Sequence, residues 1–173
     1  MATIGSLQRL SASSLSDLIL AQQAVIEASG GNPTIAIIDV RDDDYIGGHI
    51  KGAQNVPSRT LEAMYPTLVR QLQDKETVVF HCALSQVRGP SAALRYIRER
   101  DRILAAQAKR AKKAASSNAE TASGEDEKSS PPTMEQKVYV LDRGFVGWQE
   151  VFGEDKRLTE GYSKELWQDG YWG

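Results

Sequence analysis

The sequence predicts an α/β protein with a central parallel β-sheet flanked by helices. The first observation is a recurrence of short aliphatic, β-branched runs, each the length of one buried strand: residues 34–40 (TIAIIDV), 77–80 (TVVF) and 138–141 (VYVL). The second is that segments with apolar residues at helical spacing lie between these runs. Strands that alternate with helices favour a parallel sheet.

The elements around these strands follow in chain order. Residues 14–28 place apolar side chains on one helical face, and the glycines after them end the run. Residues 53–57 (AQNVP) indicate a short strand, and residues 59–73 a helix. Another helix begins at residue 89, with a proline in its first turn, where a missing N–H costs no hydrogen bond. Residues 145–152 (FVGWQEVF) complete the pattern as a short amphipathic helix.

We expect one domain over residues 1–173, with its core in about 14–103 and 137–168. Residues 104–136 are rich in Ala, Ser, Lys and Glu and nearly lack large apolar side chains, which predicts a solvated helical extension leading into a disordered insertion. Its basic run would suit nuclear import, but a solvated helix face is the simpler interpretation. The basic residues are Lys109, Arg110, Lys112 and Lys113.

Composition restricts the partners and the compartment. The formal net charge is −2 and no apolar run approaches the length of a membrane span, so we expect neither a nucleic-acid nor a membrane partner. The N-terminus does not have the pattern of a secretory signal. A single cysteine cannot form an internal disulfide, which suits a reducing compartment, cytoplasmic or nuclear. One Cys and two His also argue against a structural metal site.

The predicted chemistry lies in the stretch HCALSQVRGP, which contains the only cysteine of the chain. Cys82 follows a predicted strand and Arg88 precedes a predicted helix, so the turn between them aims backbone N–H groups and the helix dipole into one concavity. Such a concavity binds a tetrahedral oxyanion; Arg88 adds a two-pronged donor, and the same field favours a nucleophilic thiolate. A lone cysteine after a strand is more often a small buried apolar residue, but this context favours catalysis. The loop residues expected to bind the oxyanion through their backbone are Ala83, Leu84, Ser85, Gln86, Val87 and Arg88.

Two further stretches complete a family resemblance. Residues 39–57 read DVRDDDYIGGHIKGAQNVP, and residues 141–153 read LDRGFVGWQEVFG. Together with HCALSQVRGP, these stretches resemble the rhodanese-like domain over most of the chain outside the insertion. The positions that carry the resemblance are Asp39, Val40, Arg41, Gly48, His49, Ile50, Gly52, Ala53, Asn55, Pro57, Cys82 and Arg88.

The length of the cysteine loop points to one branch of that family. The loop of sulfurtransferase rhodaneses has the spacing C-x4-R. Cys82 and Arg88 have the spacing C-x5-R, and in this the chain resembles the cell-division-cycle dual-specificity phosphatases and the fungal and plant arsenate reductases. The phosphatases have an acidic residue where this chain has Val87. Without an acid to protonate the leaving group, aryl phosphates should turn over faster than alkyl phosphates. The regulatory disulfide of that branch needs a second cysteine, which this chain lacks.

The resemblance implies a cysteine-dependent phosphatase, a phosphoric monoester hydrolase of the tyrosine or dual-specificity type that needs neither metal nor cofactor. Cys82 would attack phosphorus to form a phosphocysteine, and water would then hydrolyse it. Its substrate would be a phosphorylated protein or a small phosphate oxyanion. One alternative is an arsenate reductase supplied with electrons by glutathione or glutaredoxin. Another is a non-catalytic module that binds oxyanions or phosphoproteins.

Several other polar and aromatic residues are expected to be structural. His81 should orient the loop through ring hydrogen bonds rather than act as a base. Asp39 and Arg41 should form a partly buried pair, and His49 should hydrogen-bond a loop, because buried polar groups need partners. Trp167 should pack on the domain.

Overall fold

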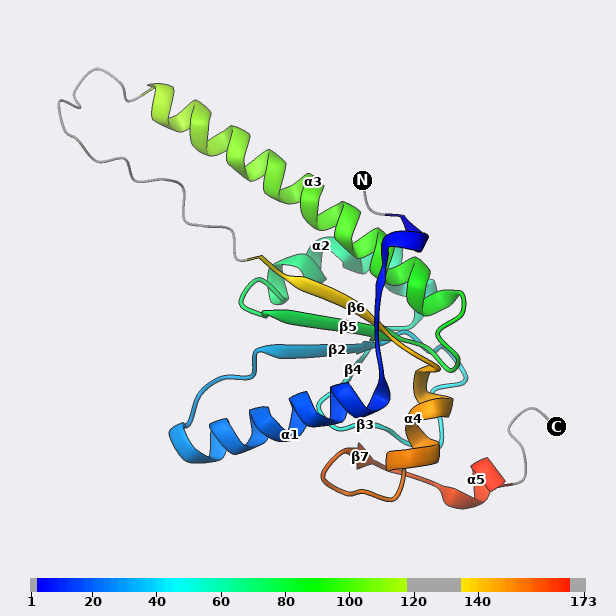
Figure 1. The fold of residues 1–173 in the computed structure, drawn as a ribbon. Coiled ribbons are helices and arrows are strands. Elements are labelled where there is room, and N and C mark those ends of the chain that lie inside the picture. Colours follow the sequence, from blue (N-terminus) through cyan, green and yellow to red (C-terminus); the bar gives the residue numbers. More distant parts are fainter. Residues whose placement is uncertain (1–2, 118–134, 169–173) are drawn as a thin grey trace.

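The computed structural model describes residues 3–117 and 135–168, and its centre is a five-stranded sheet in the order β1-β6-β5-β2-β4 (Figure 1). All neighbouring strands pair in parallel. The five strands are β1 (Gln8–Leu10), β2 (Ile35–Asp39), β4 (Gln54–Asn55), β5 (Thr77–His81) and β6 (Lys137–Leu141). The prediction of an α/β fold with a central parallel sheet flanked by helices is confirmed.

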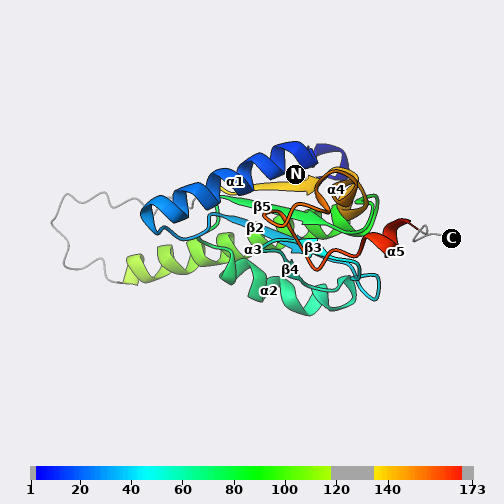
Figure 2. The ribbon, with the colours of Figure 1, turned by 90° about the horizontal axis from the view of Figure 1, so that it is seen from below.

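Helices cover both faces of the sheet (Figure 2). α2 (Leu61–Gln71) and α3 (Arg88–Ser117) lie on one face, and α1 (Ala12–Ser29) and α4 (Gly144–Phe152) lie on the other. The central strands are therefore apolar on both sides: in β5, Val78 and Phe80 join the core under α2 and α3, and Val79 joins the core under α1 and α4. This two-sided burial explains why the strands read as continuous apolar runs rather than alternating ones.

Several short elements were not predicted. β1 is a three-residue edge strand with two polar residues, too short to show periodicity. A small second sheet pairs β3 (His49–Ile50) with β7 (Thr159–Glu160) in antiparallel fashion, so two-residue strands far apart in sequence meet. The helix α5 (Lys164–Gln168) and the 3-10 turns η1 (Ile4–Ser6) and η2 (Ser58–Thr60) complete the fold. The chain thus already enters the sheet at β1, before residue 14.

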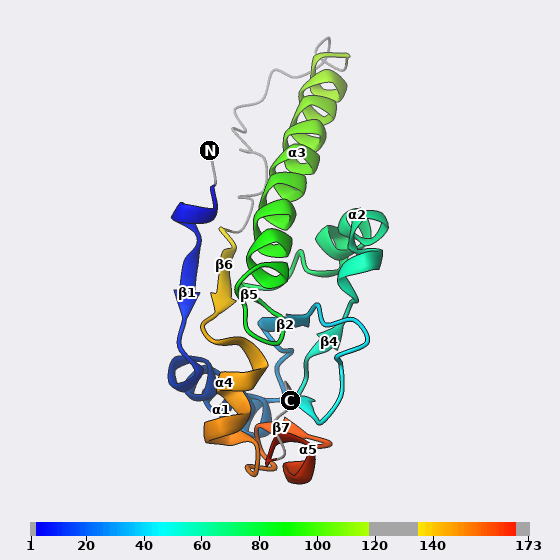
Figure 3. The same cartoon turned by 90° about the vertical axis from the view of Figure 1, so that its right-hand side faces the viewer.

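The segment predicted to be low in complexity divides into parts. α3 continues past the core to Ser117, with residues 105–113 exposed, and projects beyond the end of the sheet (Figure 3). The predicted disorder falls mainly on residues 118–134, which lie outside the described residues. Gln136, at the end of the segment, is half-buried and anchored to the domain: its Nε2 donates to the carbonyls of Leu72 (2.7 Å) and Lys75 (3.0 Å), and its Oε1 accepts from the Tyr96 hydroxyl (2.6 Å). Its polar neighbours in the sequence gave no sign of this anchor.

Candidate active site

The cysteine loop lies at the carboxyl edge of the sheet, where β5 ends. Cys82 follows β5 directly, and α3 begins at Arg88, so residues 83–87 form the connection. Cys82 is 3% exposed at the base of a hollow of about 160 Å³. The hollow is lined by Cys82, Ala83, Leu84, Gln86, Val87 and Arg88. Parallel α/β folds place ligand sites at this edge, and the hollow is the size of a small anion rather than of a cofactor.

The backbone of Ser85 points its N–H at the sulfur. The nitrogen lies 3.2 Å from Cys82 Sγ, and Ser85 adopts a positive φ of 55° to present it. The backbone of the loop therefore contacts the sulfur directly. The Ser85 hydroxyl is buried and has no hydrogen-bond partner among the described residues.

The first turn of α4 binds the backbone of the cysteine loop. The N–H of Phe145 donates to the carbonyl of Cys82 (3.0 Å), and the N–H of Val146 donates to the carbonyl of Ala83 (2.9 Å). These are N–H groups that a helix start leaves without internal partners. The approach requires Gly144: a Cβ there would stand 2.5 Å from the Ala83 oxygen, and the residue has a positive φ of 57°. The glycine of this segment is thus explained by its close approach to the cysteine loop.

The edge strand β1 supplies a second support. Arg9 Nη1 donates to the carbonyl of Ser85 (3.2 Å), and the same nitrogen lies 3.5 Å from Asp142 Oδ1. Arg9 therefore contacts the residue whose N–H faces the sulfur. No motif in the sequence pointed to this arginine, because 76 positions separate it from Ser85.

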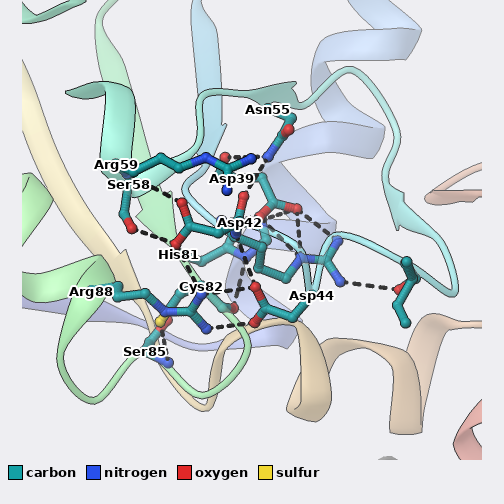
Figure 4. A network of polar contacts seen from close by, with 12 residues as sticks. Asp39, Asp42, Asp44, Asn55, Ser58, Arg59, His81, Cys82, Ser85 and Arg88 are labelled. Atoms are coloured by element: carbon teal, nitrogen blue, oxygen red, sulfur yellow. Dashed lines mark hydrogen bonds and ion pairs between the residues drawn. The ribbon is translucent and has the colours of Figure 1, made fainter. Parts of the chain in front are cut away.

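Arg88 is held by two carboxylates from the loop after β2 (Figure 4). Its Nη1 and Nη2 form a bidentate pair with Asp44 at 2.8 and 2.5 Å, and Nη1 also lies 3.4 Å from Asp42. The hydrogen bond from Arg88 lowers the pKa of Asp44, against the opposing effect of its partial burial. Burial opposes ionisation of Asp42, but hydrogen bonds from Ser58, Arg59 N–H and Arg88 outweigh it and lower the pKa of this carboxyl.

A buried charged network lies behind the loop. Asp39 and Arg41 form a bidentate pair whose side chains are both 0% exposed, so the pair predicted as partly buried is completely buried. Arg41 also donates to the carbonyl of Gly48 (2.9 Å) and lies over the Phe145 ring, 4.3 Å from its centroid. The network ties the loop after β2 to α4. The charges of Asp39 and Arg41 compensate each other, as buried charges must.

His81 joins this network from β5. Its Nδ1 lies 3.1 Å from the carbonyl of Cys82, which agrees with the predicted loop contact. Its Nε2 has no hydrogen-bond partner in the described part of the chain and lies 3.7 Å from Asp39 Oδ2. Burial lowers the pKa of His81, and Asp39 only partly offsets this, so the ring is neutral at pH 7. A neutral, enclosed imidazole has no access to substrate.

The remaining structural expectations have mixed outcomes. Trp167 packs on the domain as predicted, with its ring 5.6 Å from that of Phe145 and its Nε1 donating to the carbonyl of Gly47 (2.9 Å). His49 makes no loop hydrogen bond among the described residues; it lies in β3, 3.7 Å from Glu160 and stacked on Tyr45. The pairing of β3 with β7 places it there, and sequence alone did not show this partner.

Neither a metal site nor a membrane span is found in the part of the chain that the structure describes. Residues 3–117 and 135–168 contain no group of three or more His, Cys, Asp or Glu side chains arranged to hold a metal ion. No described helix is both long and apolar enough to cross a bilayer.

The fold and the site together define a class: an α/β domain with a cysteine–arginine loop between a central strand and a helix. Comparison with known proteins identifies the family. Residues 21–151 match the rhodanese-like domain, and the chain belongs to that family.

Two curated relatives have similar sequences. The chain is 39% identical over 119 residues to "Arsenate reductase 2.1" of Oryza sativa subsp. japonica, covering 68% of this chain and 58% of that protein. It is 38% identical over 118 residues to "Dual specificity phosphatase Cdc25" of Arabidopsis thaliana, covering 68% of this chain and 63% of that protein. The chain thus spans less than two thirds of the length of either.

One solved structure extends the similarity to nearly the whole chain. It is described as "Structure of Ygr203w, a yeast protein tyrosine phosphatase of the Rhodanese family". It aligns with a TM-score of 0.65 at 26% identity and covers 96% of this chain and 99% of that one. The relatives' names divide between phosphatase and reductase, the same two reactions that the loop length suggests.

Proposed function

We propose that this protein is a cysteine-dependent phosphatase of the tyrosine or dual-specificity type. The supporting observation is the loop geometry: Cys82 Sγ lies in an anion-sized hollow, receives a hydrogen bond from Ser85 N–H, and shares that hollow with Arg88. Cys82 thiolate attacks phosphorus as the P–O bond to the leaving group breaks, and the leaving group takes a proton. Water then hydrolyses the phosphocysteine, releasing phosphate and restoring the thiolate.

The loop stabilises the negative charge on the oxygens bound to phosphorus. Its uncharged residues present backbone N–H groups, and Arg88 adds a planar donor that matches two oxygens. A phosphorylated protein or small phosphate oxyanion in the cytoplasm or nucleus is the proposed substrate. A reducing compartment would keep Cys82 as a thiol, since the chain contains no second cysteine.

Arsenate reduction is the second candidate, favoured by the 39% identity to a protein of that name. Arsenate has nearly the shape of phosphate and suits the same hollow. Reduction of As(V) to As(III) takes two electrons, supplied as two thiols become one disulfide. Because Cys82 is a single thiol, glutathione or a glutaredoxin would have to supply the rest.

The experiment that tests the proposal compares two reactions on the full chain. We expect phosphate release from an aryl phosphate such as p-nitrophenyl phosphate, and Cys82→Ser should abolish it while retaining the fold and phosphate binding, because backbone amides and Arg88 form the hollow. Glutathione-dependent arsenate reduction is measured in parallel. Arsenate reduction without aryl phosphate turnover would replace the first candidate by the second, and phosphate binding without either reaction would leave a binding module.

A further inference from the structure

We propose that Asp44 is a positioning residue that fixes the Arg88 guanidinium so that one edge of it faces the oxyanion hollow. The inference rests on the proposed function only in that it assigns an oxyanion as ligand. Some of the Arg88 donors are already occupied by carboxylates. Asp44 takes one hydrogen from Nη1 and one from Nη2, and Asp42 lies near the other hydrogen of Nη1.

The donors that stay available lie on a single edge. Arg88 Nε makes no hydrogen bond among the described residues, and neither does the second hydrogen of Nη2. In a planar guanidinium these two N–H groups are parallel, and they form the side-on fork that matches two oxygens of a phosphate. Arg88 lines the hollow together with Cys82, and Figure 4 shows its side chain beside Cys82 with the tip turned toward Asp44. The Asp44 carboxylate therefore holds the Nη1–Nη2 end of the guanidinium, while the edge formed by Nε and Nη2 remains open.

Asp44 is itself fixed. Its Oδ1 accepts the N–H of Asp42 (2.9 Å), and Asp42 in turn accepts from the Ser58 hydroxyl (2.5 Å) and the Arg59 N–H (3.1 Å). Each carboxylate thus has a backbone donor that sets its direction before it meets Arg88. A long side chain that is already ordered loses less conformational freedom when the oxyanion binds.

The neighbouring aspartate provides a matched control. Asp43 carries the same charge one residue away, but its side chain is 90% exposed and faces Arg59 at 3.3 Å. Asp43→Asn therefore removes the same charge from the same loop without touching Arg88. Asp44→Asn is nearly isosteric but has one acceptor oxygen instead of two, so it cannot make the bidentate clamp.

The test measures binding of inorganic phosphate, which does not depend on turnover. Cys82 is the only cysteine, so the rate of alkylation by iodoacetamide reports on it alone, and protection by phosphate gives a dissociation constant. We expect Asp44→Asn to raise that constant about tenfold, because a misplaced fork loses its alignment with the oxyanion. The phosphate-free alkylation rate should stay within about threefold of the parent, because Ser85 N–H and not Asp44 contacts the sulfur. Asp43→Asn should change neither.

The outcomes separate the alternatives. A dissociation constant that falls in Asp44→Asn would mean that Asp44 competes with the oxyanion for Arg88, and an unchanged one would mean that it does not act on binding. If the alkylation rate moved by the same factor as the dissociation constant, the residue would merely support the loop. Any of these three results overturns the inference. Wild-type protein that binds phosphate but turns over no phosphate ester would refute the proposed phosphatase and leave this inference intact.

Discussion

The two loops that meet at the carboxyl edge of the sheet are built in opposite ways. The loop after β5, residues 82–87, has no charged side chain of its own and is held through its backbone carbonyls, which accept from N–H groups of α4 and from the Arg9 side chain of β1. The loop after β2, residues 40–48, is held by charged side chains: a buried Arg41 and two carboxylates directed at Arg88. In the proposed site, the first loop presents N–H donors to the oxyanion and the second orients the Arg88 cation. Separate loops allow each of these tasks to be fixed without disturbing the other.

The comparison predicts that the loop after β2 is most sensitive to the loss of a charged side chain. Arg41→Met should lower the free energy of unfolding by about 3–5 kcal/mol, because it leaves Asp39 as an uncompensated charge in the core. Urea denaturation measures this. Arg59→Met, which removes an arginine from an exposed pair with Asp43 in the same region, should leave stability nearly unchanged. Equal losses in the two variants would show that burial of the Asp39–Arg41 pair has no special weight.

The loop after β5 should instead be most sensitive to a side chain that crowds its backbone. Gly144→Ala should destabilise the protein by about 2–3 kcal/mol and sharply reduce oxyanion binding, since the new Cβ meets the Ala83 carbonyl at 2.5 Å. Gly30→Ala provides the control: Gly30 also has a positive φ, of 69°, but a Cβ there meets nothing within 4 Å. That variant should lose only the cost of a left-handed alanine, about 1 kcal/mol, and keep its binding. Thermal melts and phosphate protection of Cys82 distinguish the two.

His81 lies where the strands of the two loops pair, opposite Asp39, and it predicts a pH dependence. Its pKa is lowered by burial, against the attraction of Asp39 and with a smaller contribution from Arg41. Below pH 6.5, the ordinary pKa of histidine, His81 is protonated in the unfolded chain but stays neutral in the folded chain. The free energy of unfolding therefore falls as the pH falls. The slope should approach about 1.4 kcal/mol per pH unit. Denaturation at pH 7.5 and 5.5 should show this loss, and His81→Gln should flatten it; an unchanged slope would assign it to other groups.

The smallest effect is expected at Arg9, which braces the loop from a partly exposed position. Arg9→Gln should cost well under 1 kcal/mol of stability but lower turnover of an aryl phosphate about threefold, because the Ser85 carbonyl loses its charged donor. Asp142→Asn removes the ion pair of Arg9 and leaves its hydrogen bond to Ser85, so its turnover should match the parent. If Asp142→Asn reproduced the loss, the ion pair rather than the contact with Ser85 would be responsible.

Sequence reasoning recovered the parts of this molecule that are encoded locally. The strands β2, β5 and β6 appear as apolar runs, and the loop from Cys82 to Arg88 is one continuous motif between a strand and a helix, as the sequence predicted. The site contacts that it missed join segments far apart in the chain. Asp44 and Arg88 are 44 positions apart, and nothing in the acidic run DDD indicates which carboxylate turns inward. Arg9 was missed because it is 76 positions from Ser85 and lies in a three-residue strand, which is too short to be predicted from periodicity.

The anchor at Gln136 has a consequence for how the chain can vary. This residue binds the turn after α2 and the Tyr96 hydroxyl, while α3 is fixed to the core through Tyr96 and its neighbours. Both ends of the intervening stretch are therefore tethered independently of its length. In general, the free-energy cost of closing a loop rises by only about 0.6 kcal/mol for each doubling of its length. A change in the number of residues between these two tethers should therefore cost little at the cysteine loop, which lies at the opposite end of the sheet.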